Sequence, residues 1–231
     1  MNTMPQNKLI RANGFTLVEL LTVIAIISIM SVLAFAAFTS LKKAGDVTGA
    51  TATISGVLEQ ARAYAMANNT YVFVGIEETD INTPTGQAQS PGTGRVAIQA
   101  FASNDGTGNS AQDNLKPIAK LQILNNLHLL SSLALTTGNF SQRATTGVDN
   151  VANSFPAPVN TIAAGNFTFS QIIAFNAQGL VSIPTTASTS GLQYIEYDLE
   201  PTNGTTLPAT TTNGAAIQVD ATIGAVNVFR P

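Results

Sequence analysis

The side chain with the clearest chemical consequence is Glu19, near the start of a long apolar segment. No charged residue occurs from Leu20 to Leu41, and this run is longer than the roughly 20 residues that cross the hydrocarbon layer of a membrane as a helix. A carboxylate at the centre of that layer costs about 2.5–3.5 kcal/mol. Because nothing basic lies nearby on the same helix, we expect Glu19 to pair with an amine from elsewhere, which points to assembly.

The other residues that could perform chemistry form no catalytic pattern. His128 is the only histidine and lies among leucines, so we expect a structural role. The acidic run Glu77–Asp80 could offer oxygen ligands to calcium, although a solvated loop is the simpler interpretation. The run Asp105–Asn109 has a similar composition but lacks the length and the closing glutamate of an EF-hand. The sequence contains no phosphate loop, nucleophile elbow or dinucleotide turn, so we predict no enzyme, no cofactor and no metal site.

The composition is that of a weakly charged protein and agrees with an exported subunit. Charged residues make up 10% of the chain, against about a quarter in typical domains. Cysteine is absent, which rules out a fold stapled by disulfides. The formal net charge is −3, with 10 basic and 13 acidic side chains. Loss of Lys8 and Arg11 with a leader would leave 8 and 13, or −5, and an acidic protein is a poor general binder of nucleic acid.

The residues before the apolar segment have the features of a cleaved leader. Residues 1–14 are short and polar, and the cations Lys8 and Arg11 favour the cytoplasmic side of a membrane. Cleavage after Gly14 would make Phe15 the new N-terminus, with a free amine about one helical turn from Glu19. That amine could serve Glu19 within one chain or between neighbouring copies.

The segment Gly14-Phe15-Thr16-Leu17-Val18-Glu19, followed by a charge-free apolar helix, resembles the class III signal of type IV pilins and type II secretion pseudopilins. The resemblance implies cleavage between Gly14 and Phe15 by a prepilin peptidase and N-methylation of Phe15. It also implies that Glu19 pairs with the Phe15 amine of an adjacent subunit. The implied partners are other pilin or pseudopilin subunits, an inner-membrane assembly platform and membrane lipid.

Two other interpretations of the N-terminal segment remain open. An ordinary secretory signal peptide would be cut after Ala34-Phe35-Ala36, although such signals avoid an acidic residue in the apolar core. A plain single-span anchor would keep the whole segment. N-terminal sequencing separates the three, because the first residue would be Phe15, Ala37 or Met1 respectively.

Helical character continues beyond the apolar segment. One apolar face recurs at helical spacing, while Glu59 and Arg62 lie off it, and Asn68-Asn69 is a plausible helix end. Glycines at 45, 49 and 56 weaken this helix by up to roughly 1 kcal/mol each. Either they are merely tolerated, or they soften a region that bends or melts during assembly. The apolar face consists of Ile54, Val57, Leu58, Ala61, Tyr64 and Ala65.

Later segments alternate in the manner of strands and are separated by loops rich in Gly, Thr, Ser and Asn. Asn176–Gly179 and Thr222–Gly224 read as turns between strands. Residues 115–135 favour two strands around Asn125-Asn126 over a helix. The remaining strands are expected at 71–76, 95–101, 167–169, 172–175, 180–183, 194–199, 216–220 and 225–229, with loops at 79–94, 104–114, 138–160 and 185–191.

These features predict an α+β, type IV pilin-like fold, in which a long N-terminal helix packs on an antiparallel sheet. The first half of the helix would span the membrane and the second would be amphipathic. The expected parts are a cleaved leader at 1–14, a transmembrane and filament-core helix at 15–42, and a periplasmic or extracellular globular domain at 43–231. Gly56–Asn69, Phe175–Gly179 and Gly224–Val228 resemble the minor-pseudopilin branch typified by GspH and FimT.

The resemblance implies a structural subunit, a minor pilin or pseudopilin, that is held in the bacterial inner membrane by a single span. It would then assemble into a helical filament of a type II secretion or type IV pilus system. The alternative is a binding module at a pilus tip, such as a receptor for DNA uptake. That role needs a basic patch, and the later half of the chain offers only Lys116, Lys120, Arg143 and Arg230, which makes nucleic acid an unlikely partner.

Overall fold

The computed structural model describes residues 15–130, 143–144, 146–150, 161–181, 193–209 and 213–230. Gly14 and the rest of the expected leader lie outside these residues. The chain divides into two compact units, Met1–Leu41 and Lys42–Pro231.

The helix α1 runs from Leu17 to Asn68. In the second unit its expected apolar face is confirmed, because all of its members except the half-buried Tyr64 are buried. Asn69 follows with φ 49°, the left-handed conformation that ends many helices, so the end expected at Asn68-Asn69 is also confirmed. A Cβ built at Gly45, Gly49 or Gly56 would meet nothing within 4 Å, so packing of the described residues does not require these glycines.

A twisted sheet follows the helix, in the order β11-β10-β9-β4-β2-β1-β8. The neighbours on this path are antiparallel; β3 also pairs with β2, and the short β5 pairs with β9 in parallel. The strands are β1 (Val72–Asp80), β2 (Gly94–Ser103), β3 (Leu115–Pro117), β4 (Gln122–Leu130), β5 (Val148–Asn150), β8 (Gln171–Phe175), β9 (Tyr194–Pro201), β10 (Ala215–Asp220) and β11 (Val226–Phe229).

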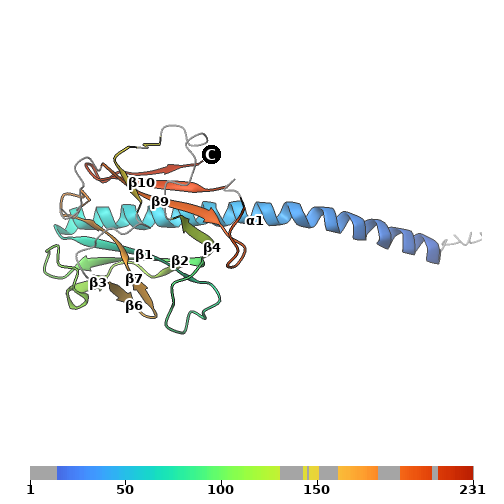
Figure 1. Ribbon diagram of the computed structural model, residues 1–231, viewed down its shortest axis with the longest axis horizontal. Helices are drawn as coiled ribbons and strands as arrows, with labels where there is room; N and C mark the ends of the chain where they lie inside the picture. Colours follow the sequence, from blue (N-terminus) through green and yellow to red (C-terminus); the bar gives the residue numbers. More distant parts are fainter. Residues whose placement is uncertain are drawn as a thin grey trace, which may run out of the picture. The chain divides into compact units, whose positions relative to one another are not determined.

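The sheet has a hydrophobic core on each face. The larger core joins the apolar side of α1 to one face, through alternate residues such as Val72, Val74 and Ile76 of β1, and Figure 1 shows the second half of α1 lying along the strands. The smaller core, built on Phe73 and Phe101, lies under a hairpin of β6 (Ile162–Ala164) and β7 (Phe167–Phe169). The expected α+β fold, with the N-terminal helix on an antiparallel sheet, is therefore confirmed.

Two expected turns are brought together against α1. Arg62 donates from Nε to the carbonyl of Gly179 (3.3 Å) and from Nη2 to the carbonyl of Ile223 (2.7 Å). Gly224 has φ +68°, and a Cβ there would lie 1.9 Å from the Gly179 carbonyl oxygen, so only glycine fits this approach. The side chain that the sequence placed off the apolar face thus ties the helix to both turns.

Several expectations about loops and strands are wrong. Asn125-Asn126 is no turn but lies inside β4, where the register with β2 shifts and Asn126 takes φ 61°; the strand bulges here instead of reversing. β1 extends to Asp80, so the expected loop is shorter, and β5 lies within the expected loop at 138–160. Val181 forms only an isolated bridge with Phe175, while residues 182–183 and the expected loop at 185–191 lie outside the described residues.

Candidate functional site

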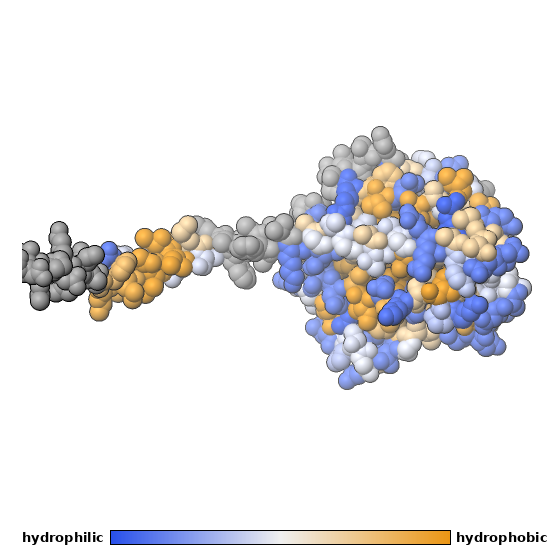
Figure 2. Space-filling model, turned by 180° about the vertical axis from the view of Figure 1, so that it is seen from behind, coloured by the Kyte–Doolittle hydropathy of each residue, from blue (hydrophilic) through white to orange (hydrophobic). Residues whose placement is uncertain are grey.

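The N-terminal part of α1 presents apolar side chains without cover. All described side chains from Phe15 to Val32 are exposed, among them Phe15 at 75% and Leu17 at 79%. In Figure 2 the described helical stretch between the grey segments is predominantly orange. A contiguous apolar surface of this kind marks a site of interaction with a partner or a membrane.

Glu19 lies in the first turn of α1, where a carboxylate is favoured by the helix dipole. Its Oε2 accepts hydrogen bonds from the backbone N–H of Thr16 (3.5 Å) and from the Thr16 hydroxyl (3.4 Å), while its own N–H donates to Thr16 Oγ1 (3.2 Å). These reciprocal contacts form a capping box, for which Thr-x-x-Glu is the sequence signal. Glu19 therefore has a partner within its own chain, which the sequence reasoning missed.

No helix among the described residues is both long enough and apolar enough for a membrane crossing. The membrane-spanning character of the first half of α1 is thus not confirmed.

His128 is half-buried and contacts an acidic side chain from a distant strand. Its Nδ1 lies 2.8 Å from Oε2 of Glu78 on β1, and Glu78 also accepts hydrogen bonds from the backbone N–H groups of Gly94 and Leu129. Burial acts to lower the pKa of His128, but the hydrogen bond with Glu78 and the negative charges of Glu78 and Glu200 outweigh it, so the pKa is raised. Through these contacts Glu78 on β1 bonds to the first residue of β2 and to the end of β4.

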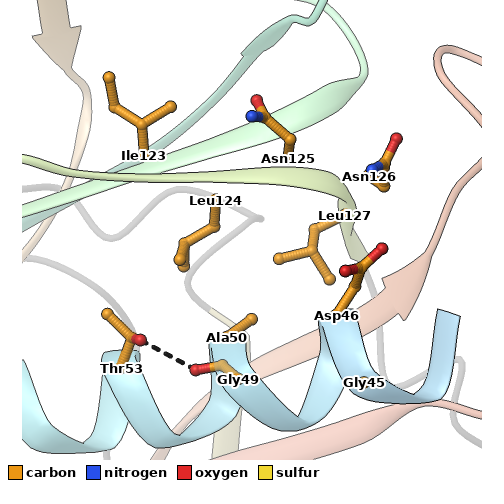
Figure 3. Close-up of a pocket in the computed structure, with 10 residues that line it drawn as sticks. All are labelled: Gly45, Asp46, Gly49, Ala50, Thr53, Ile123, Leu124, Asn125, Asn126 and Leu127. Carbon is orange, nitrogen blue, oxygen red and sulfur yellow. Dashed lines mark hydrogen bonds between the residues drawn. The ribbon is translucent and has the colours of Figure 1, made fainter. Parts of the chain in front are cut away.

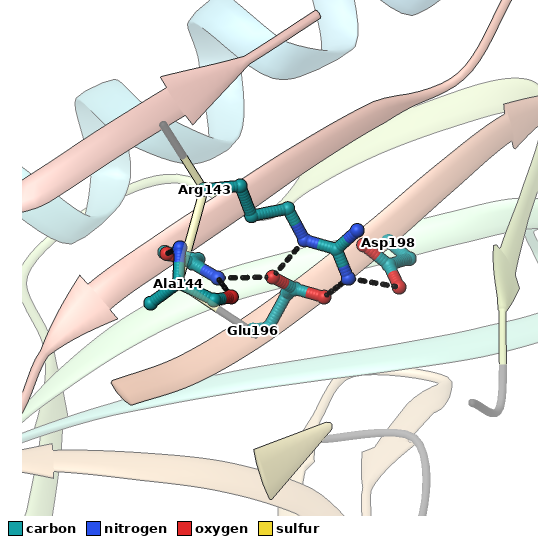
Figure 4. Close-up of polar contacts among 5 residues, drawn as sticks. Arg143, Ala144, Glu196 and Asp198 are labelled. Carbon is teal, nitrogen blue, oxygen red and sulfur yellow. Dashed lines mark hydrogen bonds and ion pairs between the residues drawn. The ribbon is translucent and has the colours of Figure 1, made fainter. Parts of the chain in front are cut away.

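A buried ion pair lies on the face of β9 opposite α1 (Figure 4). Arg143 donates to Glu196 from Nε (2.7 Å) and from Nη2 (2.5 Å), and its Nη2 lies 3.9 Å from Asp198. Both side chains of the main pair are sealed from solvent, at 1% and 0% exposure. Gln218 on β10 donates to Glu196 as well and exchanges hydrogen bonds with the backbone of Ala144. Arg143 thus attaches residues 143–144 to β9, and the contact between Gln218 and Ala144 attaches them to β10.

The four cations that a DNA-binding role would need do not all lie free on the surface. Arg143 is buried against Glu196, and Arg230 donates to the hydroxyls of Thr48 and Thr51 on α1. Lys116 and Lys120 are exposed. The described geometry therefore adds no support to the alternative of a pilus-tip DNA receptor.

The acidic runs considered as calcium ligands have other partners. Glu77 is no solvated loop residue but lies in β1 and accepts hydrogen bonds from the N–H and hydroxyl of Ser170. Asp105 accepts from Ser103, Thr107 and Asn114, and these hydrogen bonds lower its pKa. In the part of the chain that the structure describes, no group of three or more His, Asp or Glu side chains could hold a metal ion.

An open groove of about 480 Å³ runs between α1 and β4. Leu124 and Leu127 point toward the helix, while Ile123 and Asn125 point away from it (Figure 3). The helix side is formed by Gly45, Asp46, Gly49, Ala50 and Thr53.

The ion pairs were the larger omission of the sequence reasoning. The alternation of Glu196, Asp198 and Glu200 along one strand face was visible, but the same pattern is typical of a solvated face. Glu78 and His128 are 50 residues apart and carry no local signal of their contact. Only Thr16 could have been found from the sequence, through its spacing from Glu19.

Comparison with known proteins locates the N-terminal signal. The model of the prokaryotic N-terminal methylation motif matches residues 10–35, a range that includes Gly14, Phe15 and Glu19. No curated protein and no solved structure matches the chain. The motif match supports a type IV pilin-like or pseudopilin subunit processed by a prepilin peptidase, and it points to a structural subunit that assembles with other pilins rather than to an enzyme.

Proposed function

We propose that this chain is a minor pilin or pseudopilin of the GspH and FimT-like branch. The peptidase would cut between Gly14 and Phe15, and Phe15 would then be N-methylated. The mature chain would wait in the inner membrane as a single-pass protein with its globular domain in the periplasm. An assembly platform would draw it from there into a pilus or pseudopilus. The observation that carries the proposal is the methylation motif over residues 10–35.

The exposed apolar helix supports an assembly step in which the lipid around it is exchanged for helices of other copies. Side chains from Leu17 to Val32 are exposed in the single chain, and burial against lipid or against helices of other copies would remove that surface from water. A head-to-tail contact that repeats without closing builds a fibre. Such a contact would bring the Phe15 amine of one copy to Glu19 of the next.

Glu19 would change partners during this step. In the single chain its carboxylate caps its own helix through Thr16 at 3.4–3.5 Å, which are long hydrogen bonds. A charge-assisted bond to a neighbouring ammonium group is shorter and stronger. We therefore expect the capping contact to yield to the intermolecular pair.

Glu19→Ala tests this proposal. The variant should be cleaved and methylated normally but enter filaments at least about tenfold less. The Phe15 ammonium group of the neighbouring copy would be left unpaired, and an unpaired buried charge costs about 3–5 kcal/mol. Mass spectrometry of the mature N-terminus measures processing, and quantitative blotting of sheared filaments measures incorporation. Thr22→Val is the matched control, since the Thr22 hydroxyl donates to the Glu19 carbonyl in its own helix and has no other bond among the residues that the structure describes.

Normal filament incorporation of Glu19→Ala would refute the pairing of Glu19 with Phe15. A native product with an intact leader, or a start at Ala37, would refute the subunit assignment itself.

A further inference from the structure

A second pocket lies on the face of the sheet opposite α1, between β2, β3 and the β6–β7 hairpin. Its volume is about 490 Å³, within the range of ligand pockets in proteins. Phe101 and Leu121 belong to or pack against the smaller hydrophobic core. The lining contains no charged side chain and consists of Gln99, Phe101, Gln112, Leu115, Pro117, Leu121, Ala163, Ala164 and Gly165.

Two glutamine amides line this pocket, and the first of them, Gln112, fixes its form. Gln112 accepts a hydrogen bond from the Ala163 N–H (2.7 Å) and donates to the Ala163 carbonyl (3.1 Å). This pair of bonds holds the hairpin against the 3₁₀ turn η1 (Gln112–Asn114). The two walls of the pocket are therefore set before any ligand arrives, which lowers the entropic cost of binding.

The second amide leaves one polar atom for a ligand. Gln99 is exposed by only 8% and donates from Nε2 to the carbonyl of Ala119 (2.8 Å). No described residue donates to its Oε1. This atom is not fully buried either, so it keeps contact with solvent. A ligand with a donor at this point could take the place of water at this acceptor, whose residue is otherwise buried.

We propose that this pocket binds a neutral aromatic group that carries one hydrogen-bond donor, such as an indole. The ring would cover the side chains of Phe101, Leu115 and Leu121, and its N–H would donate to Oε1 of Gln99. The uncharged lining disfavours ions, since a charge brought there would lose water without gaining a partner. The site does not depend on the filament role, because it lies on the face of the sheet that α1 does not cover.

The chain contains no tryptophan, so the fluorescence of an indole probe can be followed directly. The full mature chain in detergent micelles is titrated into N-acetyltryptophanamide and, separately, into the derivative methylated at the indole nitrogen. Empty micelles provide the background. We expect saturable binding with about a 5- to 10-fold preference for the unmethylated probe, the effect of one hydrogen bond.

Three variants localise the binding. Gln99→Met should abolish the preference between the two probes, and Ala164→Leu should weaken both by filling the pocket. Gln122→Met is the matched control, because the side chain of Gln122 on β4 bonds, among the described residues, only to the carbonyl of Lys120, and the substitution should leave both affinities unchanged. Thermal unfolding verifies that each variant is folded. If Gln99→Met does not fold, the effect of Ala164→Leu on the two affinities tests the location of the site.

Absence of saturable binding, or equal affinity for the two probes in the unaltered chain, would overturn the proposal. Binding that Ala164→Leu leaves unchanged would place the probe elsewhere and would overturn it as well.

Discussion

Removal of the Arg143 guanidinium should strongly destabilise the globular unit. Arg143 and Glu196 are exposed by only 1% and 0%, so water cannot replace the guanidinium in Arg143→Met. The Glu196 carboxylate would keep its hydrogen bond from Gln218 but lose its counter-charge, and Asp198 would lose the same cation. Breaking a buried pair from one side costs about 3–5 kcal/mol.

The expected fall in unfolding temperature follows from the size of the unit, residues 42–231. At about 2–4 °C per kcal/mol for domains of that length, the midpoint should drop by about 6–20 °C. Circular dichroism of the full chain in detergent micelles, followed on heating, measures the change. Arg230→Met is the matched control, because within the described part of the chain the Arg230 side chain bonds only to two threonine hydroxyls, and the substitution should cost about 1 kcal/mol.

The double variant Arg143→Met with Glu196→Gln separates lost packing from a stranded charge. If the stranded carboxylate causes the loss, neutralising it should recover about half of the destabilisation or more. A midpoint for Arg143→Met within 2–4 °C of the unaltered chain, the effect of about 1 kcal/mol, would refute the reasoning. So would a double variant that is less stable than Arg143→Met alone.

The remaining expectations concern one histidine, one tyrosine and two glycines. Because the folded-state pKa of His128 is raised, its stabilising charge is fully present below about pH 6.5 and is lost as pH rises through the folded value; the stability difference between the unaltered chain and His128→Gln in urea should therefore shrink as pH rises. Tyr197→Phe should raise the free energy of unfolding by about 1 kcal/mol, since the buried hydroxyl has no hydrogen-bond partner among the described residues. A lower free energy of unfolding in urea would contradict this expectation. Gly75→Ala should cost about 1–3 kcal/mol, because its Cβ would lie 2.6 Å from Phe169. Gly45→Ala, which meets nothing within 4 Å, should instead gain about 0.5–1 kcal/mol, and both glycine variants are measured by thermal unfolding.

The acidic strand β9 illustrates how a local pattern can mislead. Tyr194–Leu199 alternates apolar and acidic residues, which correctly predicts a strand but is typical of one that faces water on one side. In the structure Glu196, Asp198 and Glu200 are all buried. The cation that meets the first two comes from a segment some 53 residues away, and no local rule relates the two positions.

Asn125-Asn126 shows the same limit for backbone geometry. Two adjacent asparagines between apolar runs favour a turn, because asparagine tolerates positive φ. The positive φ at Asn126 is present, but β4 has a neighbour on each side, β2 and then β9. Continued pairing keeps the strand running, and the irregularity becomes a bulge.

What the sequence determined by itself is therefore local: the charge-free run after Glu19, the apolar face and end of α1, and the turns at Gly179 and Gly224. These follow from side-chain periodicity and from backbone preferences within a few residues. Which charges meet, where an amide acceptor comes to lie at the wall of a pocket and how Arg62 joins two turns were decided by the tertiary structure alone. Such contacts join strands far apart in the chain, and burial then makes each partner indispensable to the other.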